Sequence, residues 1–473
     1  MSPPTMGADM PAFPPLPSAF VDTLEQQFGS RFSVAQAVRD QYGRDESPFP
    51  PMPPQAVVRA HSNEDVRQVV RACAEHRVPL IPYGAGSSLE GHILAVRGGL
   101  TLDLSEMNQI LAVQPEDLTV TVQAGVTRRQ LNDYLRDTGL FFPIDPGADA
   151  TLGGMCATRA SGTNAVRYGT MRENVLSLRA VMPDGELIKT ASRAKKSSTG
   201  YDLTRLLIGS EGTLGVITEV TVKLYPQPEA VSAAICGFPS VDQAVAAVIQ
   251  TIQLGIPVAR VELLDTHTVR AVNLYSKLAL HEGPMLLFEF HGSPAGVTEQ
   301  AQTVQDICHE FDGQDFEWAT HQEDRNRLWT ARHNAYFATL QLRPGATAIS
   351  TDCCVPISRL AECIAQTNAD LAQASFPSCV VGHVGDGNFH VQMLIDPANP
   401  TEWEEAEAVN QRLVRRAIQM DGTCTGEHGV GLHKMDFIIE EHGAETIAWM
   451  RRIKQAFDPF NIMNPGKLLK PQS

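Results

Sequence analysis

The sequence has no paired cysteine spacing and no excess of basic residues, and each absence excludes a class of protein. Its nine cysteines are an odd number, scattered without a Cys-x-x-Cys pair, so we predict mostly reduced thiols in the cytoplasm. Basic residues are in the minority, with 38 Lys and Arg against 54 Asp and Glu and a formal net charge of −16. This balance argues against a nucleic acid or an anionic membrane as partner, because both require a basic surface.

Segments typical of membrane insertion or export are also missing. No uncharged apolar run approaches the roughly 20 residues that a spanning helix needs. The proline-rich start, MSPPTMGADMPAFPPLPSAF, has no basic stretch followed by an apolar one, so we do not expect a secretory signal. We expect a protein without a transmembrane segment, with peripheral attachment to the inner membrane as the alternative to a purely cytoplasmic location.

The first half of the chain predicts a β-α-β unit that differs from a dinucleotide-binding fold. Val57–Ala60 reads as a strand, Ser62 and Asp65 form a capping-box-like start to a helix that ends near His76, and VPLIPYG reads as the next strand. The glycine-rich GAGSSLEG then follows the second strand. The Rossmann fingerprint G-x-G-x-x-G belongs in the first β-to-α turn, so it is absent.

Three segments are unusually rich in small residues. They are PYGAGSSLEG, the stretch from PIDPGADATLGG to NAVRYG, and GSEGTLGVITEVTVKLYP, which ends in an alternating strand from Val216 to Leu224. Small residues let the backbone approach a flat ligand closely, and backbone N–H groups of such loops can wrap a pyrophosphate. A flexible surface loop is the alternative for the first segment, because isolated glycine-rich loops are weak signals.

After Pro226 the pattern of expected elements changes. Strands and helices follow in the order β-α-β-β-α-β up to residue 320, which is typical of a ferredoxin-like arrangement. Further helices are expected at 322–341, 358–374, 402–420 and 443–456, with strands around 347–355 and 379–395. With 473 residues, two or three domains are expected. We place them at 1–228 (core from about 50), 229–425 and 426–473, the last returning to the first domain.

The segment GHVGDGNFH, residues 382–390, holds two histidines symmetrically about an Asp-Gly pair. If Asp386 and Gly387 are the centre of a two-residue hairpin turn, His383 faces His390 on the partner strand. Directly opposite residues have Cβ atoms about 4.5–5.5 Å apart, close enough to bind one metal ion. The alternative is two ordinary histidines on a partly buried sheet.

Two further clusters could complete a site with these histidines. Glu427, in CTGEHGVG, could add a carboxylate to make a two-His-one-carboxylate set for Zn²⁺, Mn²⁺ or Fe²⁺. The alternative for this segment is a helix cap or turn. Arg332 lies on an expected helix and could bind a substrate carboxylate with both arms of its guanidinium; a surface salt bridge is its alternative.

Taken together, these motifs resemble a known family. The small-residue segments resemble the FAD-binding domain of flavoproteins of the p-cresol-methylhydroxylase/vanillyl-alcohol-oxidase (PCMH/VAO) type. GHVGDGNFH, GTCTGEHGVG, FDPFNIMNPGKLL and the segment from ARHNAYF to PISRL resemble the C-terminal domain of FAD-linked oxidases, with the closest pattern in the D-lactate dehydrogenase (cytochrome) family. The resemblance covers residues from about 50 to 470. It implies an α+β fold with a two-subdomain PCMH/VAO-type FAD-binding domain, a ferredoxin-like cap domain and a C-terminal helical segment.

The resemblance also implies roles for individual residues. His383, His390 and Glu427 match metal ligands, Arg332 matches a carboxylate-binding arginine, and His428 matches a substrate-contacting histidine that would act as the base. Gln392 replaces a substrate-contacting asparagine. The contacts to FAD are assigned to Pro82, Tyr83, Gly84, Ala85, Gly86, Ser87, Ser88, Pro146, Gly147, Gly153, Gly154, Ser161, Gly162, Gly169, Glu211, Gly212, Gly215, Ile217 and Asn464.

Two departures from the relatives that act on D-2-hydroxyglutarate narrow the expected substrate. Tyr336 stands where those relatives carry a threonine, and Ser350 where they carry a lysine that could bind a second carboxylate. A short monocarboxylate such as D-lactate is therefore expected, oxidised to the keto acid by hydride transfer from C2 to flavin N5 with a divalent metal (Zn or Mn). FAD is expected to be non-covalent, because Gly and Ser occupy the usual position of the attaching histidine and His92 comes later.

The sequence leaves the electron acceptor, the oligomeric state and several alternative functions open. Electrons would pass to a separate acceptor such as cytochrome c, a quinone or an electron-transfer flavoprotein, and a homodimer is a further expectation. The same motifs occur in the FAD-linked subunit of glycolate oxidase and in D-2-hydroxyglutarate dehydrogenases. Remoter alternatives are a non-redox enzyme of the alkyl-glycerone-phosphate synthase type and a flavin-free metal-binding regulator.

Overall fold

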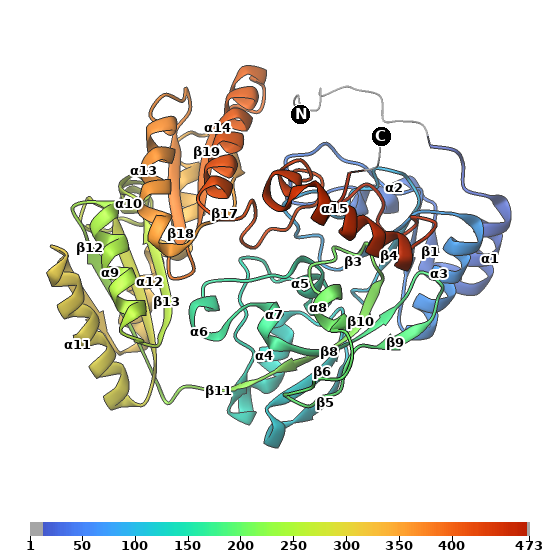
Figure 1. The fold of residues 1–473 in the computed structure, drawn as a ribbon, viewed down its shortest axis with the longest axis horizontal. Helices are drawn as coiled ribbons and strands as arrows, with labels where there is room; N and C mark the ends of the chain where they lie inside the picture. The colour runs from blue at the N-terminus through green and yellow to red at the C-terminus, as the bar shows by residue number, and fades with distance from the viewer. Residues whose placement is uncertain (1–12, 471–473) are drawn as a thin grey trace. The chain divides into compact units, whose positions relative to one another are not determined.

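A computed structural model describes residues 13–470, and the first twelve residues of the proline-rich start lie outside it. The chain divides into two compact units (Figure 1), which are described separately. The eight-strand unit comprises Gly162–Tyr168 and Pro228–Gly426. The two-sheet unit, named for its two larger sheets, comprises the other described residues, namely 13–161, Gly169–Gln227 and 427–470.

The first sheet of the two-sheet unit contains both strands of the predicted β-α-β segment. Its strand order is β1-β2-β4-β3, with β2, β4 and β3 parallel. Helix α3 begins where the Ser62 hydroxyl accepts a hydrogen bond from the Asp65 N–H at 3.1 Å, as the capping pattern predicts. The elements are α1 (Ser18–Phe28), β1 (Phe32–Ser33), β2 (Ala56–Arg59), α3 (Asn63–His76), β3 (Leu80–Tyr83) and β4 (Leu100–Asp103).

The second sheet of this unit is antiparallel, in the order β5-β6-β10-β8-β9. Val120, Val122 and Val220 point from it into a core shared with α4 and α5. The last segment of the chain joins this unit, because Asn464 donates its backbone N–H to Leu80 O at 2.8 Å along the edge of β3. The elements are β5 (Ile110–Gln114), β6 (Thr119–Gln123), α4 (Arg128–Leu135), α5 (Leu152–Thr158), β8 (Val175–Val181), β9 (Leu187–Lys189), α8 (Leu203–Leu207), β10 (Val216–Lys223) and α15 (Phe437–Phe457).

The eight-strand unit is a sheet covered by helices on both faces (Figure 1). Its order β15-β12-β14-β13 is the ferredoxin-like order, and β18, β19 and β16 extend it, with β17 pairing to β19. The α+β fold class predicted from the sequence is therefore confirmed. The elements are β12 (Ala230–Gly237), α9 (Val241–Gln253), β13 (Val258–Leu264), α10 (Thr266–Ser276), β14 (Met285–Gly292), α11 (Pro294–Glu310), β15 (Gln314–Ala319), α12 (Gln322–Leu340), β16 (Thr347–Ser350), β17 (Cys353–Cys354), α13 (Leu360–Leu371), β18 (Ser378–His383), β19 (Asn388–Ile395) and α14 (Pro400–Gln419).

The two faces of this sheet have different covers. Ala234 and Cys236 of β12 face a core with α9, α11, α13 and α14, whereas Ala233 and Ile235 face α10 and α12. This alternation follows from the two-residue period of a strand. Helix α10 was not predicted; it begins where Asp265 accepts the Thr268 N–H at 2.8 Å. Across residues 13–470, no helix is both long and apolar enough to cross a bilayer.

Candidate active site

The hairpin that carries the two histidines differs from the one predicted. His383 pairs with Asn388, and Val381 pairs with His390, so the predicted direct pairing of the histidines is wrong. The loop has four residues, closed by a hydrogen bond from Asp386 N to His383 O at 3.1 Å. Gly387 ends it with φ +78°, and a Cβ there would lie 2.0 Å from Val355 O. The backbone contact with Val355 thus requires glycine in a left-handed conformation at the loop's end.

The histidines nevertheless share one face of the sheet. The register places His390 two residues beyond the partner of His383, and residues two apart point to the same side. Their rings are buried, with centroids 5.4 Å apart and planes at 80°, and their ligand-capable atoms lie within 4.8 Å of one another. The two imidazoles are therefore neighbours, as predicted, although the predicted strand register is wrong.

One nitrogen of each ring is held by a partner inside the unit. His390 Nδ1 lies 2.9 Å from Thr351 O and His383 Nδ1 lies 2.7 Å from Glu262 Oε1. A carbonyl oxygen only accepts, so His390 carries its proton on Nδ1. Burial alone would raise the pKa of Glu262, but His383 and Arg332 outweigh it and hold the pKa below its usual value, so this carboxylate also accepts. In their neutral forms, both rings would then carry the lone pair on Nε2, the arrangement found in metal-binding histidines.

Glu262 also joins the predicted arginine to this cluster. Arg332, on α12, donates from Nε to Glu262 Oε2 at 2.7 Å. The Glu262 side chain is fully buried, and each of its oxygens holds one partner. Sequence reasoning missed Glu262; its one signal was an acidic residue within the otherwise apolar run from Val261 to Leu264.

The other two predicted substrate contacts, Gln392 and Tyr336, differ in their burial. Gln392 is buried on the histidine face of β19, and its Oε1 accepts a hydrogen bond from Thr339 on α12 at 2.6 Å. Tyr336 lies one helical turn after Arg332, is 45% exposed, and packs edge-on against Phe337. Gln392 is therefore fixed in place by the fold, whereas Tyr336 is open to solvent.

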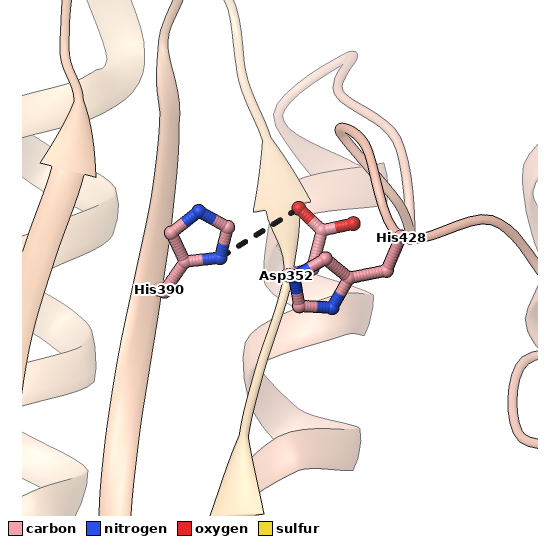
Figure 2. A group of neighbouring side chains, drawn as sticks. All are labelled: Asp352, His390 and His428. Atoms are coloured by element: carbon pink, nitrogen blue, oxygen red, sulfur yellow. Dashed lines mark ion pairs between the residues drawn. The ribbon is translucent and has the colours of Figure 1, made fainter. Parts of the chain in front are cut away.

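Asp352 is a second buried carboxylate that sequence reasoning did not include among the site residues. Its Oδ1 lies 3.9 Å from His390 Nδ1, the ion pair drawn in Figure 2, and accepts from Asn388 Nδ2 at 2.8 Å. Its Oδ2 accepts from Thr425 Oγ1 at 2.7 Å. A Cβ at Gly426 would lie 2.1 Å from Asn388 Nδ2, so a side chain there would have to displace the Asn388 amide. His428, also labelled in Figure 2, belongs to the two-sheet unit.

Glu427 and His428 open the last segment of the two-sheet unit, directly after Gly426. Within that unit, His428 Nδ1 lies 3.4 Å from Glu90 Oε1, which also accepts from Lys434 Nζ at 2.9 Å. Burial alone would raise the pKa of Glu90, but Lys434 and neighbouring histidines hold it well below its usual value. His428 therefore has a buried, ionised carboxylate beside its ring.

The segments predicted to bind FAD converge inside the two-sheet unit. A Cβ at Gly84 would lie 2.3 Å from Thr151 Oγ1, which brings the first two segments together. A Cβ at Gly212 would lie 3.2 Å from Pro82 Cγ and 3.8 Å from Asn464 Cβ, which adds the third segment and the C-terminal one. Little room is thus left for a side chain at Gly84, and the φ of +73° at Gly212 favours glycine, as expected of a closely wrapped ligand loop.

Polar groups at this convergence also suit a bound cofactor. Asn464 Nδ2 donates to Glu211 O at 2.8 Å, and the Glu211 carboxylate accepts the backbone N–H of Val430 at 2.7 Å. Within the described residues, the buried Ser210 hydroxyl has no hydrogen-bond partner. These features fit FAD. Glu211 and Gly212 have positive φ, whereas Gly162 lies outside the two-sheet unit and open space surrounds Gly147.

Comparisons with known proteins match both halves of the chain. Residues 54–191 match the FAD binding domain, and residues 227–468 match the C-terminal domain of FAD linked oxidases. A probable mitochondrial D-lactate dehydrogenase of Danio rerio is 50% identical over 441 residues, covering 93% of this chain and 89% of that protein. The mitochondrial D-lactate dehydrogenase [cytochrome] of Arabidopsis thaliana is 49% identical, covering 88% of this chain and 74% of that protein.

More distant matches share the fold or the family. Glycolate oxidase subunit GlcD of Bacillus subtilis is 36% identical, covering 92% of this chain and 93% of that protein. The crystal structure of p-cresol methylhydroxylase with substrate bound superposes with a TM-score of 0.77 at 18% identity, covering 96% of this chain and 97% of the other, which shows a shared fold. The resemblance found in the sequence is therefore confirmed: the chain belongs to the FAD-linked oxidases and is an FAD-dependent oxidoreductase.

Proposed function

We propose that this protein oxidises a D-2-hydroxy acid, with D-lactate as the substrate and pyruvate as the product. The observation that carries the proposal is the Arg332–Glu262–His383 chain of hydrogen bonds, which sets a guanidinium and a histidine pair on one buried sheet face. A 2-hydroxy acid offers a carboxylate for the first and a hydroxyl for the second. The probable D-lactate dehydrogenase of Danio rerio and the D-lactate dehydrogenase [cytochrome] of Arabidopsis thaliana support this choice of substrate.

The arginine is the proposed carboxylate anchor. Its Nε is committed to Glu262, which leaves its two terminal nitrogens to bind both carboxylate oxygens. This grip would fix which face of C2 is presented to the flavin and so contribute to the choice of enantiomer. Gln392, whose amide oxygen is held by Thr339, would offer its Nε2 as a further donor to the substrate.

His383, His390 and Glu427 are the proposed ligands of a divalent metal, Zn²⁺ or Mn²⁺. The Nδ1 hydrogen bonds of both histidines fit this role, because they leave Nε2 as the binding atom. Glu427 is one peptide bond beyond Gly426, which packs against Asn388 and Asp352. When bound, such a metal lowers the pKa of a coordinated hydroxyl.

His428 is the proposed base that accepts the hydroxyl proton. Its Nδ1 faces the ionised Glu90 at 3.4 Å, which favours an Nδ1–H tautomer and leaves Nε2 to receive the proton. FAD supplies the two-electron oxidant when bound. FAD is proposed to bind non-covalently, because Gly and Ser occupy the usual position of the attaching histidine.

The acceptor, assembly and location are proposed from the sequence and the relatives. Reduced FAD would pass electrons to cytochrome c, as the name of the Arabidopsis protein suggests, or to a quinone or an electron-transfer flavoprotein. All nine cysteines are free thiols, which suits a reducing compartment such as the predicted cytoplasm. Two of the relatives named above are mitochondrial, so the compartment remains a prediction. A homodimer also stays a proposal.

Glycolate is the second candidate substrate, favoured by the likeness to the glycolate oxidase subunit. An anaerobic titration of the purified yellow protein distinguishes these substrates. D-lactate, L-lactate, glycolate and D-2-hydroxyglutarate are added separately while the flavin band is followed. We expect fast bleaching by D-lactate and much slower bleaching by the others. No bleaching by any of them in metal-replete protein would refute the proposal and favour the non-redox synthase.

A further inference from the structure

Glu262 is the one buried group of this cluster that bonds both the proposed substrate anchor and a proposed metal ligand. It lies on β13, next to β18 in the sheet, where Leu263 pairs with Gly382. Continuing this antiparallel register by one residue places Glu262 opposite His383. The strand pairing therefore places the Glu262 carboxylate beside His383. The packing of α12 on the same face of the sheet places Arg332 beside it.

We propose that Glu262 is a positioning residue that sets the geometry of Arg332 and His383 together. This inference rests on the proposed function. With Oε1 at 2.7 Å from His383 Nδ1, the proton of the imidazole is kept on Nδ1 and the lone pair on Nε2. With Oε2 at 2.7 Å from Arg332 Nε, the plane of the guanidinium is fixed, and its two terminal nitrogens stay available for the substrate carboxylate.

Neither glutamine nor aspartate, the two most similar side chains, should keep both contacts. Glutamine has one acceptor oxygen, and its amide nitrogen donates, so one of the two N–H groups would face another donor. Either the guanidinium turns away or the imidazole shifts its proton to Nε2. Aspartate keeps the charge but is one methylene shorter, so it cannot reach both partners while β13 and α12 stay in place. One substitution at Glu262 should therefore disturb two sites at once.

If Glu262 contributes only to stability, a different experimental result is expected. Glu402 on helix α14 is the control, since it also pairs with an arginine and accepts from Arg343 through both oxygens, at 2.6 and 2.9 Å. The Arg343 side chain is 29% exposed, so this pair lies nearer the surface than Glu262, and Glu402→Gln removes a paired carboxylate without contacting Arg332 or either histidine. If Glu262 only balances charge, Glu262→Gln, like Glu402→Gln, should lower the melting temperature and leave ligand binding unchanged.

The experiment uses the full-length, FAD-loaded protein after metal removal. Mn²⁺ affinity is measured by calorimetry, and kcat and KM for D-lactate are measured at saturating Mn²⁺. For Glu262→Gln we expect Mn²⁺ binding weakened 10- to 100-fold, the range for lost outer-shell partners of a metal ligand. We also expect KM to rise roughly tenfold or more as the anchor loses its orientation. Glu402→Gln should keep both values within twofold of wild type.

The outcomes separate this inference from the proposed function. Mn²⁺ affinity and KM both within twofold of wild type in Glu262→Gln would overturn the positioning role while leaving the function intact. Wild-type protein that binds no Mn²⁺ and is not bleached by D-lactate would overturn the function, and this inference with it. If Glu262→Gln does not retain FAD, Glu262→Asp decides: a change in at least one value supports the role, and wild-type values for both refute it.

Discussion

Replacing Arg332 by lysine is expected to weaken substrate binding while leaving the flavin in place. In the structure, the guanidinium donates from Nε to Glu262 Oε2 at 2.7 Å, and its two terminal nitrogens are the proposed donors to the substrate carboxylate. A lysine ammonium is a single point charge and cannot reproduce this fork. The buried Glu262 carboxylate would compete with the substrate for that ammonium, because an unpaired buried charge is costly.

The size of the effect follows from the hydrogen bonds that are lost. A hydrogen bond to a charged group contributes about 1.5–3 kcal/mol. Losing one arm of the carboxylate fork should therefore lower kcat/KM for D-lactate by roughly 10- to 150-fold. We expect most of this loss in KM, because the carboxylate is bound alike in the ground state and the transition state.

The assay is steady-state turnover with an artificial electron acceptor, together with the anaerobic bleaching titration. Arg325→Lys is the matched control, since Arg325 lies two turns earlier on α12 and donates to Val231 O at 2.7 Å. It should leave kcat/KM within about twofold of wild type. If kcat/KM is unchanged in Arg332→Lys, Arg332 does not bind the substrate carboxylate and the proposed site is wrong.

Three further predictions test the metal, the hairpin and a buried lysine. His390→Ala should lose tight Mn²⁺ binding and turnover yet stay yellow; full activity after chelation would exclude the metal. Gly387→Ala should lower stability by at least about 1–2 kcal/mol in urea unfolding, because φ is +78° and the Cβ would lie 2.0 Å from Val355 O; an unchanged midpoint would contradict the loop geometry. Burial lowers the pKa of Lys467 to about 7, so between this value and about 10.4 the unfolded chain binds a proton that the folded chain does not. The contribution of Lys467 to stability should rise with pH across that window, so the melting temperature of wild type relative to Lys467→Met should increase from pH 7 to 9.5; a constant difference would refute the shift.

Local patterns in the sequence were sufficient for most elements and for part of the site. The Ser62 cap, the helix carrying Arg332 and the ferredoxin-like order of strands all follow from periodicity and short-range hydrogen bonding, which involve residues close in the chain. The two histidines lie on one face because they are an odd number of residues apart around a loop of even length. That parity holds for both the predicted loop and the observed one.

The contacts that connect the site residues depend on long-range packing. The hairpin register depends on Gly387 meeting Val355 O, a backbone contact that no local pattern encodes. Glu262 reads as an ordinary strand residue in the sequence, yet it bonds Arg332 and His383, which lie 70 and 121 positions away. Such partners are chosen by the pairing of β13 with β18 and by the packing of α12 over the sheet. Local sequence thus sets which residue types and which faces are available, whereas long-range packing selects the carboxylate that joins the arginine to the histidine.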